Sequence, residues 1–342
     1  MTTRTALYSE PGAEQGPVAV SEGAGKHLDE AARAVASAHP SAGPILQLLQ
    51  TRVDRALECD TPDLLIGTLA AVAAQRPAME SAGLKTHAFR ELRQGLGSAS
   101  ARRKAWTWTR ICASRPEAEA RELACALLDT FWRDHRKEVE RIALNLARDE
   151  DREVRLYAAS TIARIIRSSF RANVRYLRAW SRHADPSVRR QVIIATVAVA
   201  DEEHPEWARL LLDMLEPHLS DRDPYIRRNL GPFALGQGML RVYPQETLDR
   251  LEKWLQSDNE IVRWNVAMAF TAPIGALALE RGLEILRLLA ADPRRFVWGA
   301  AALAIKNLAT LRPRRVRPVL RQWMKDPALR VAVSTALNAS VR

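Results

Sequence analysis

Arginine residues recur along this sequence, several of them in adjacent pairs. A guanidinium group can hold a phosphate with two parallel hydrogen bonds, so arginines repeated along one surface suit a sugar-phosphate backbone. The formal net charge of +11 points the same way, because a strongly basic chain favours a polyanionic partner, nucleic acid first. The pairs are Arg189–Arg190, Arg227–Arg228, Arg294–Arg295 and Arg314–Arg315.

A second basic segment mixes cations with indole rings. Arg102, Arg103 and Lys104 directly precede Trp106 and Trp108. This composition can grip a sugar-phosphate backbone or stack on bases. The alternative is a buried tryptophan pair that anchors an early helical repeat.

The arginine pairs belong to a repeated motif, Asp-x-x-(Val/Ile/Leu)-Arg. Taking the arginine as the marker, and Trp298 where tryptophan replaces it, the copies recur every 32–38 residues. Self-similarity at such a period is the signature of a solenoid. The copies run from Asp151 to Arg155, Asp185 to Arg189, Asp223 to Arg227 and Asp326 to Arg330, with longer forms from Asp258 to Arg263 and Asp292 to Trp298, and a degenerate form from Glu117 to Arg121.

The motif predicts the start of the second helix of a helical hairpin. The aspartate caps the free backbone N–H groups, and a following proline fits the first helical position. One hairpin cannot bury its apolar face alone, so stacked copies form the core. We therefore predict an all-α, right-handed α-solenoid of HEAT-like hairpins over residues 45–342. Its first part, residues 45–115, is an irregular helical cap, residues 116–342 are regular repeats, and residues 1–44 are a mostly disordered leader.

The arginines of the motif have two possible roles. Second helices are expected to line the concave face of a HEAT array, where these side chains would contact a ligand. The first arginine of each motif could instead form a ladder, within or between repeats, with the capping aspartate of a neighbour. The second arginine has no structural requirement, which favours Arg190 and Arg228 as ligand contacts, and Trp298 is expected to face the groove. The predicted DNA contacts are therefore Arg155, Arg189, Arg190, Arg227, Arg228, Arg263 and Trp298, together with Arg102, Arg103 and Lys104.

Other functional classes lack support in the sequence. It contains no P-loop, dinucleotide-binding fingerprint or hydrolase motif, and its histidines and three cysteines show no metal-ligand spacing. No cofactor or metal is expected. No apolar stretch is suited to span a bilayer, so the expected location is the cytoplasm, or the nucleoid if the protein binds DNA. The stretch Gly231–Gly238 should break or kink its helix, and it is a weaker candidate for a site of different chemistry.

From about residue 120 to 270, the sequence resembles the bacterial DNA alkylation-repair glycosylases of the AlkD and AlkC types, which are built from HEAT-like repeats. The resemblance is carried by residues 151–160, 185–194, 223–231 and 242–254. It implies a basic concave cleft that holds duplex DNA. In active members, an acidic residue and tryptophans in that cleft serve the excision of alkylated purines.

The resemblance also shows where this chain departs from the family pattern. Arg190 matches a cleft arginine. Asp151 and Arg155 stand where the AlkD pattern has a tryptophan and the catalytic aspartate. Pro232 replaces a second cleft tryptophan, and Gly236 stands near the AlkC aspartate. Arg155 cannot replace the catalytic aspartate, because an arginine cannot stabilise a cationic sugar. The remaining catalytic candidate is Asp151, which lies about one helical turn away.

Two functions follow as hypotheses. The first is a DNA-binding HEAT-repeat protein related to alkylation repair, either a divergent N-glycosylase for alkylated purines or a member that binds double-stranded DNA without cleaving it. The second is a non-catalytic protein-interaction scaffold, a common use of HEAT arrays.

Overall fold

The computed structural model describes residues 42–59 and 61–338, and within them every regular element is helical. The predicted leader over residues 1–44 lies almost wholly outside the described residues. Three helices, α2 (Ala42–Cys59), α3 (Asp63–Gln75) and α4 (Ala78–Gln94), form an N-terminal group that packs on α6. The predicted boundary between residues 115 and 116 falls in the loop of the first hairpin, α5 (Ala99–Cys112) and α6 (Ala118–Leu128).

The rest of the described chain is a stack of hairpins, as the repeat predicted. Short 3₁₀ turns (Asp129–Phe131, Pro205–Trp207, Glu216–His218 and Pro273–Leu277) join some of the helices. The hairpins are α7 (Arg136–Leu146) with α8 (Arg152–Ser168), α9 (Phe170–Trp180) with α10 (Pro186–Val199), α11 (Ala208–Leu215) with α12 (Pro224–Asn229), α14 (Pro244–Leu255) with α15 (Glu260–Ala269), α16 (Leu279–Ala290) with α17 (Arg295–Leu311), and α18 (Pro313–Trp323) with α19 (Pro327–Asn338).

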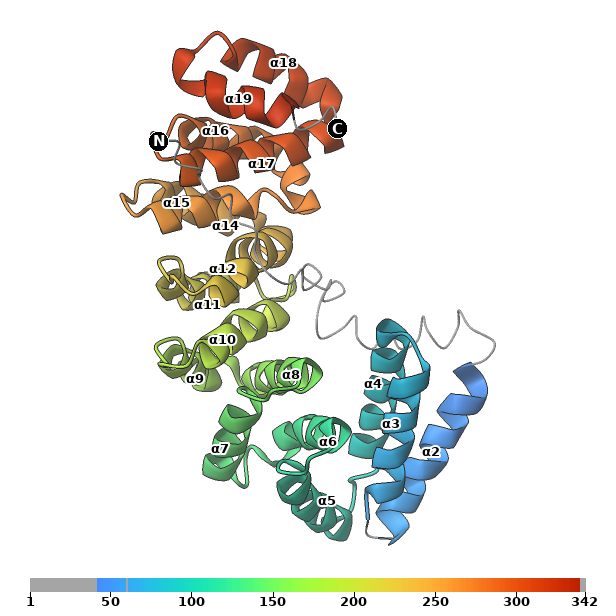
Figure 1. The fold of residues 1–342 in the computed structure, drawn as a ribbon. Helices are drawn as coiled ribbons and strands as arrows, with labels where there is room; N and C mark the ends of the chain where they lie inside the picture. Colours follow the sequence, from blue (N-terminus) through green and yellow to red (C-terminus); the bar gives the residue numbers. More distant parts are fainter. Residues whose placement is uncertain (1–41, 60, 339–342) are drawn as a thin grey trace, which may run out of the picture.

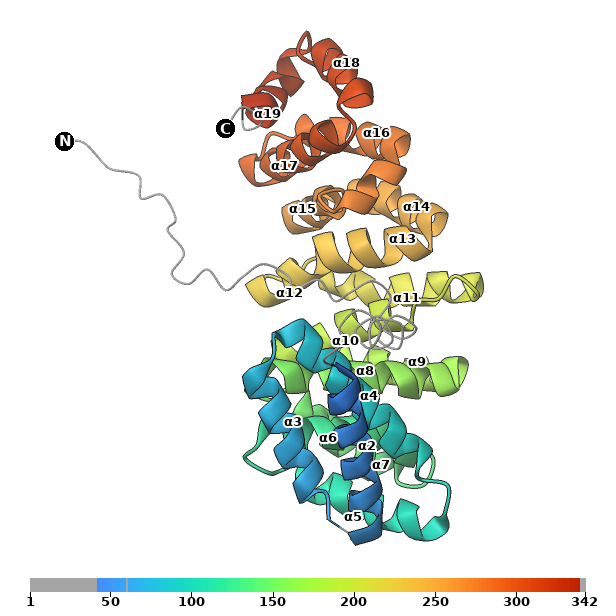
Figure 2. The same cartoon turned by 90° about the vertical axis from the view of Figure 1, so that its right-hand side faces the viewer.

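The hairpins form two layers. Figure 1 shows the stack from α5 to α19, with α2–α4 beside its lower end. In Figure 2, the first helices α9, α11, α14 and α16 lie on one side, and the second helices α12, α15 and α17 lie on the other. Second helices contact one another along the stack, for example α8 with α10 and α15 with α17. Side chains from both layers form one continuous apolar core, so the array is an α-solenoid.

Aspartates cap several second helices, as the motif predicted. Asp151 Oδ1 accepts hydrogen bonds from the N–H groups of Glu153 and Val154, at 2.7 and 3.2 Å. Asp185, Asp223 and Asp326 likewise accept from the N–H two residues ahead, at 2.7–3.0 Å. Each satisfies an N–H group that the helix itself leaves free.

The two longer motif copies begin differently from the prediction. Asn259, not Asp258, caps α15, and it accepts from the N–H of Ile261 at 2.9 Å. Asp292 lies two residues before the cap position of α17, which Arg294 occupies without a side-chain cap bond. The extra residues of these copies shift the helix start, which motif reading alone did not reveal.

At Gly231–Gly238, where the sequence predicted a break or kink, the helix instead widens into a π-helix. After α12, the chain continues as a π-helix over Leu230–Met239 and then a short turn, α13 (Leu240–Val242). A Cβ atom on Gly231 would lie 2.7 Å from Cβ of Met268, and one on Gly236 would lie 2.6 Å from the carbonyl oxygen of Ala269. The glycines therefore let this segment pack closely against α15, and most of the segment is buried.

Candidate nucleic-acid interface

The motif arginines first serve the fold. The guanidinium groups of Arg121, Arg155 and Arg189 each donate from Nη1 to the carbonyl oxygens five and six residues upstream, at 2.6–2.9 Å. Arg263 donates in a similar way to the carbonyl of Leu255 at 2.7 Å. These bonds satisfy carbonyl groups left free near the end of the preceding first helix. These four arginines therefore have a structural role through backbone carbonyl groups, which is distinct from the ladder with an aspartate considered for them.

Three of these arginines also reach a carboxylate in the next repeat. Arg121 pairs with Asp149 at 2.7 Å and Arg189 with Asp221 at 2.8 Å. The charged groups of Arg263 and Asp292 approach to 2.7 Å. The sequence analysis considered the capping aspartate as the partner. In the structure, the partner aspartate instead lies two residues before the cap position. There it also accepts the N–H of the cap residue at 2.9 Å, so one carboxylate fixes both the loop and the repeat interface.

Two motif arginines lack such a partner because the aspartate position holds another residue. That position is His183 opposite Arg155 and Ser257 opposite Arg227. Neither arginine has a carboxylate partner among the described residues, and the Nε atom of each is buried without a hydrogen bond. Arg155 and Arg227 therefore keep hydrogen-bonding capacity that the fold does not use.

Arg190, on α10, is the most unusual cation in the second-helix layer. Its side chain is only 6% exposed, and its Nε and Nη1 atoms have no hydrogen-bond partner. The guanidinium lies over the ring of Tyr225 at 4.6 Å, and the hydroxyl of Tyr225 is also buried and unpartnered. Burial lowers the pKa of Arg190; Tyr225 opposes this, whereas the positive charges of Arg155 and Arg152 add to it. We call Arg152, Arg155 and Arg190 the Arg190 cluster.

A buried cation without a counter-ion is costly unless a ligand supplies one. The positive charges of Arg155 and Arg152 act on Arg190, and no ion pair joins it to a carboxylate of the described residues. Arg152 is exposed and Arg155 is half-buried, so the cluster extends to the surface. This arrangement suits an anionic group that accepts hydrogen bonds from more than one guanidinium.

The second predicted ligand contact, Arg228, is exposed on α12, and Trp298 is half-buried on α17. Arg227 lies against two aromatic rings of the following repeats, with its guanidinium 5.8 Å from the ring centre of Trp264 and 5.7 Å from that of Phe296. Sequence reasoning missed Trp264 and Phe296. Their signal is their position: Trp264 occupies the same motif position as Arg190, and Phe296 the same position as Tyr225.

The basic segment that precedes Trp106 lies on α5, the first helix of its hairpin. Arg102 pairs with Asp134 at 3.0 Å, and Trp108 is buried. The Trp106 ring stacks on His135 at 4.3 Å. These contacts agree with the anchoring role considered for the tryptophans. Arg103 is exposed, Lys104 is half-buried, and neither makes an ion pair in the described structure.

The geometry gives little support to a catalytic carboxylate in this layer. Asp151 uses Oδ1 as a helix cap, and the neighbouring cluster is cationic. No group of three His, Cys, Asp or Glu side chains suited to a metal occurs within the described residues. Glu122, whose burial raises its pKa to about 7, is 1% exposed and pairs with Lys85. It lies between α4 and α6, away from solvent.

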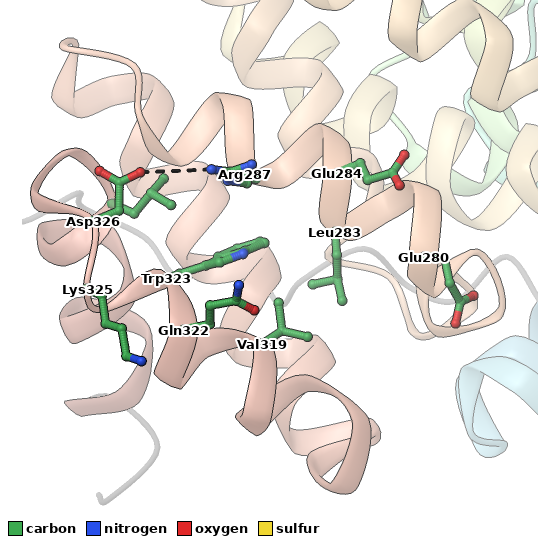
Figure 3. Close-up of a pocket in the computed structure, with 10 residues that line it drawn as sticks. Glu280, Leu283, Glu284, Arg287, Val319, Gln322, Trp323, Lys325 and Asp326 are labelled. Carbon is green, nitrogen blue, oxygen red and sulfur yellow. Dashed lines mark ion pairs between the residues drawn. The ribbon is translucent and has the colours of Figure 1, made fainter.

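An open groove lies at the C-terminal end of the molecule, between α16 and the α18–α19 hairpin (Figure 3). It has a volume of about 740 Å³. Leu283, Val319 and Trp323 form its apolar floor, and Arg287 faces Asp326 at 4.0 Å across it. Its charges are of mixed sign, so it does not resemble the Arg190 cluster. None of the described helices has the length and apolar character needed to cross a membrane.

Stacked hairpins in two layers, with capped second helices and an arginine-aspartate ladder, define a HEAT-repeat protein. A model of HEAT repeats matches residues 211–306, and a model of the DNA alkylation repair enzyme family matches residues 73–235. The match over residues 73–235 agrees with the resemblance seen in the sequence.

Solved structures with related folds are distant. The karyopherin Kap121p bound to Nup53p is 17% identical, with a TM-score of 0.39 over 85% of this chain, which spans only 37% of the karyopherin. YibA of Escherichia coli is 17% identical, with a TM-score of 0.35 over 80% of this chain and 91% of its own. An engineered protein is 16% identical, with a TM-score of 0.28 over 93% and 95%. No curated protein matches the sequence significantly.

Proposed function

We propose that this protein binds duplex DNA through its second-helix layer, with the Arg190 cluster holding phosphates of the backbone. The observation that carries the proposal is the guanidinium of Arg190, which is buried beside two other cations without a counter-ion. A phosphate would supply the missing negative charge and accept the unused N–H groups. The match of residues 73–235 to the model of the DNA alkylation repair enzyme family supports nucleic acid as the source of that phosphate.

The same cluster argues for binding without glycosidic cleavage. Base excision develops positive charge on the sugar, and a nearby carboxylate stabilises it. The position that the resemblance assigns to the catalytic aspartate holds Arg155, and Arg152 and Arg190 lie close to it. Three cations raise the energy of a cationic sugar. We therefore propose a DNA-binding protein that recognises the duplex backbone and leaves the glycosidic bond intact.

The test is fluorescence anisotropy of a labelled blunt duplex at several salt concentrations. We expect Arg155→Gln and Arg190→Met each to weaken binding and to reduce the slope of log affinity against log salt by about one. Arg178→Gln removes an exposed cation from α9, in the opposite layer, and should change neither. Arg190→Met should also keep or raise the unfolding temperature, because it removes a buried unpaired charge.

Two results would contradict the proposal. If the wild-type protein does not bind duplex DNA at low salt, the DNA interface is wrong and the protein-interaction scaffold is the better account. If binding is lost equally in Arg178→Gln, the contact is a diffuse effect of net charge. Release of an alkylated base from the bound duplex would overturn the absence of cleavage alone.

A further inference from the structure

Three side chains from successive second helices form a flat platform in the C-terminal repeats. The rings of Trp264 on α15 and Phe296 on α17 are nearly parallel, with an interplanar angle of 11° and 5.5 Å between centres. Arg227 on α12 lies against both rings. Phe296 remains 37% exposed. We call Arg227, Trp264 and Phe296 the aromatic platform.

The two rings of the platform, Trp264 and Phe296, lie beyond the part of the chain that matches the alkylation repair family, which ends at residue 235, whereas Arg227 lies within it. The platform nevertheless continues the line of the Arg190 cluster. Arg190 on α10 lies over Tyr225 on α12, and Arg227, two residues further along α12, begins the platform. The two features therefore follow one another along the same layer of helices.

The fold does not require Arg227 in this position. Ser257 replaces the aspartate that would hold Arg227 in the arginine ladder, and no carboxylate of the described residues pairs with it. Its Nε atom is buried without a hydrogen-bond partner. A ligand could supply the hydrogen-bond acceptor that the buried Nε of Arg227 lacks, and the exposed ring of Phe296 lies next to this guanidinium.

The ligand that fits such a surface is flat and attached to negative charge. A nucleobase can extend the ring stack from the exposed Phe296, and a guanidinium plane also stacks on bases. The exposed side chains of Arg228 and Arg295 flank the platform in sequence and make no ion pair in the described structure, so they are available for adjacent phosphates. Bases inside a duplex present no free face, which leaves an unpaired base as the ligand.

We propose that the aromatic platform stacks an unpaired base of a DNA strand whose adjoining duplex lies on the Arg190 cluster. The inference rests on the proposed function and extends it: the preferred ligand is a junction between duplex and single strand. A single-stranded overhang on a duplex supplies both parts of this ligand.

The experiment compares three DNA probes: a blunt duplex, the same duplex with a short single-stranded overhang, and the same overhang with abasic sites. The wild-type protein should bind the overhang probe about five-fold or more tightly than the other two, the gain expected from one stacked base. The abasic probe keeps the phosphates of the overhang, so it separates stacking from charge.

Matched variants localise the effect. Phe296→Leu keeps an apolar side chain without a flat ring, and it should reduce overhang binding to the level of the blunt duplex while leaving the duplex affinity unchanged. Phe296→Tyr keeps the ring and should retain the preference. Leu288→Ala changes another exposed apolar side chain, on α16 in the opposite layer, and should have no effect.

The failures are distinguishable. If the wild-type protein binds the blunt and overhang probes equally, or the abasic overhang as tightly as the normal one, the platform does not stack a base although the duplex interface stands. A preference that survives Phe296→Leu overturns the assignment of the site. Loss of binding to every probe rejects the proposed function together with this inference.

Discussion

At the scale of the residue, the arginine motif combines two roles that a sequence pattern cannot separate. Arg189 and Arg155 stand at equivalent positions and cap the same kind of helix end. Only Arg189 continues to a carboxylate, because the next repeat offers Asp221 where the other offers His183. The residue two positions before a helix cap, some thirty residues downstream, therefore decides whether an arginine is structural or available.

The ladder should contribute measurably to stability. Asp221→Asn keeps the oxygen that accepts the N–H of Asp223 but removes the charge paired with Arg189. Both side chains are less than 20% exposed, so we expect the free energy of unfolding in urea to fall by about 2 kcal/mol. Asp249→Asn breaks the exposed pair with Arg281 and should cost less than about 0.5 kcal/mol. Equal losses would show that burial does not strengthen the ladder.

Protonation of His218 should destabilise the fold in acid. Burial lowers the pKa of His218 to about 4; Asp221 opposes this shift and Arg189 adds to it. The unfolded chain, with an ordinary histidine pKa near 6.5, takes up the proton first as the pH falls. Stability should therefore decrease from about pH 6.5 towards pH 4, by on the order of 3 kcal/mol for this group.

The measurement for His218 is the free energy of unfolding in urea across that pH range. His218→Leu removes the titrating group, so the variant should lose less stability than the wild-type protein between pH 7 and pH 4.5. Parallel curves for the two proteins would mean that His218 is not the group responsible.

At the scale of the element, the π-helix at Leu230–Met239 shows that a helix can be set by its neighbours. Proline and glycine signals predicted a break after Asn229, and the regular α-helix does end there. The chain nevertheless stays helical, because close contact with α15 favours a wider coil in which the glycines present no side chain. The local sequence predicts where the regular α-helix ends. The π-helix that follows depends on packing against α15, some thirty residues further along the chain.

Two glycine substitutions test this explanation. Gly236→Ala would place a Cβ atom 2.6 Å from the backbone oxygen of Ala269, and we expect the free energy of unfolding to fall by about 2 kcal/mol. Gly299→Ala on α17 meets nothing within 4 Å. It should raise stability by about 0.5–1 kcal/mol, since alanine favours a helix interior. Thermal or urea unfolding of both variants gives the comparison, and similar effects would contradict the packing role.

At the scale of the whole molecule, the repeat period was enough to predict the solenoid. The caps Asp151, Asp185, Asp223 and Asp326 fixed where second helices begin, while the longer copies at Asp258 and Asp292 misled by a residue or two. For the candidate site, the pattern pointed to Arg190 but not to its burial, which depends on Tyr225 in the next repeat. The sequence did not predict a role for Trp264 and Phe296, because the two rings come into contact only when the repeats are stacked.

The interrupted ladder also bears on how the superhelix bends. Buried or half-buried arginine-aspartate pairs join the loops at three successive-repeat interfaces, whereas His183 and Ser257 leave two others without this connection. At the His183 interface, the connection is the half-exposed pair of Arg148 with Asp185. A superhelix bends most readily at the interfaces where neighbouring repeats are held together by the fewest interactions. We expect curvature to adjust at these two interfaces, so the arginines left free for a ligand lie at the joints that can move to meet it.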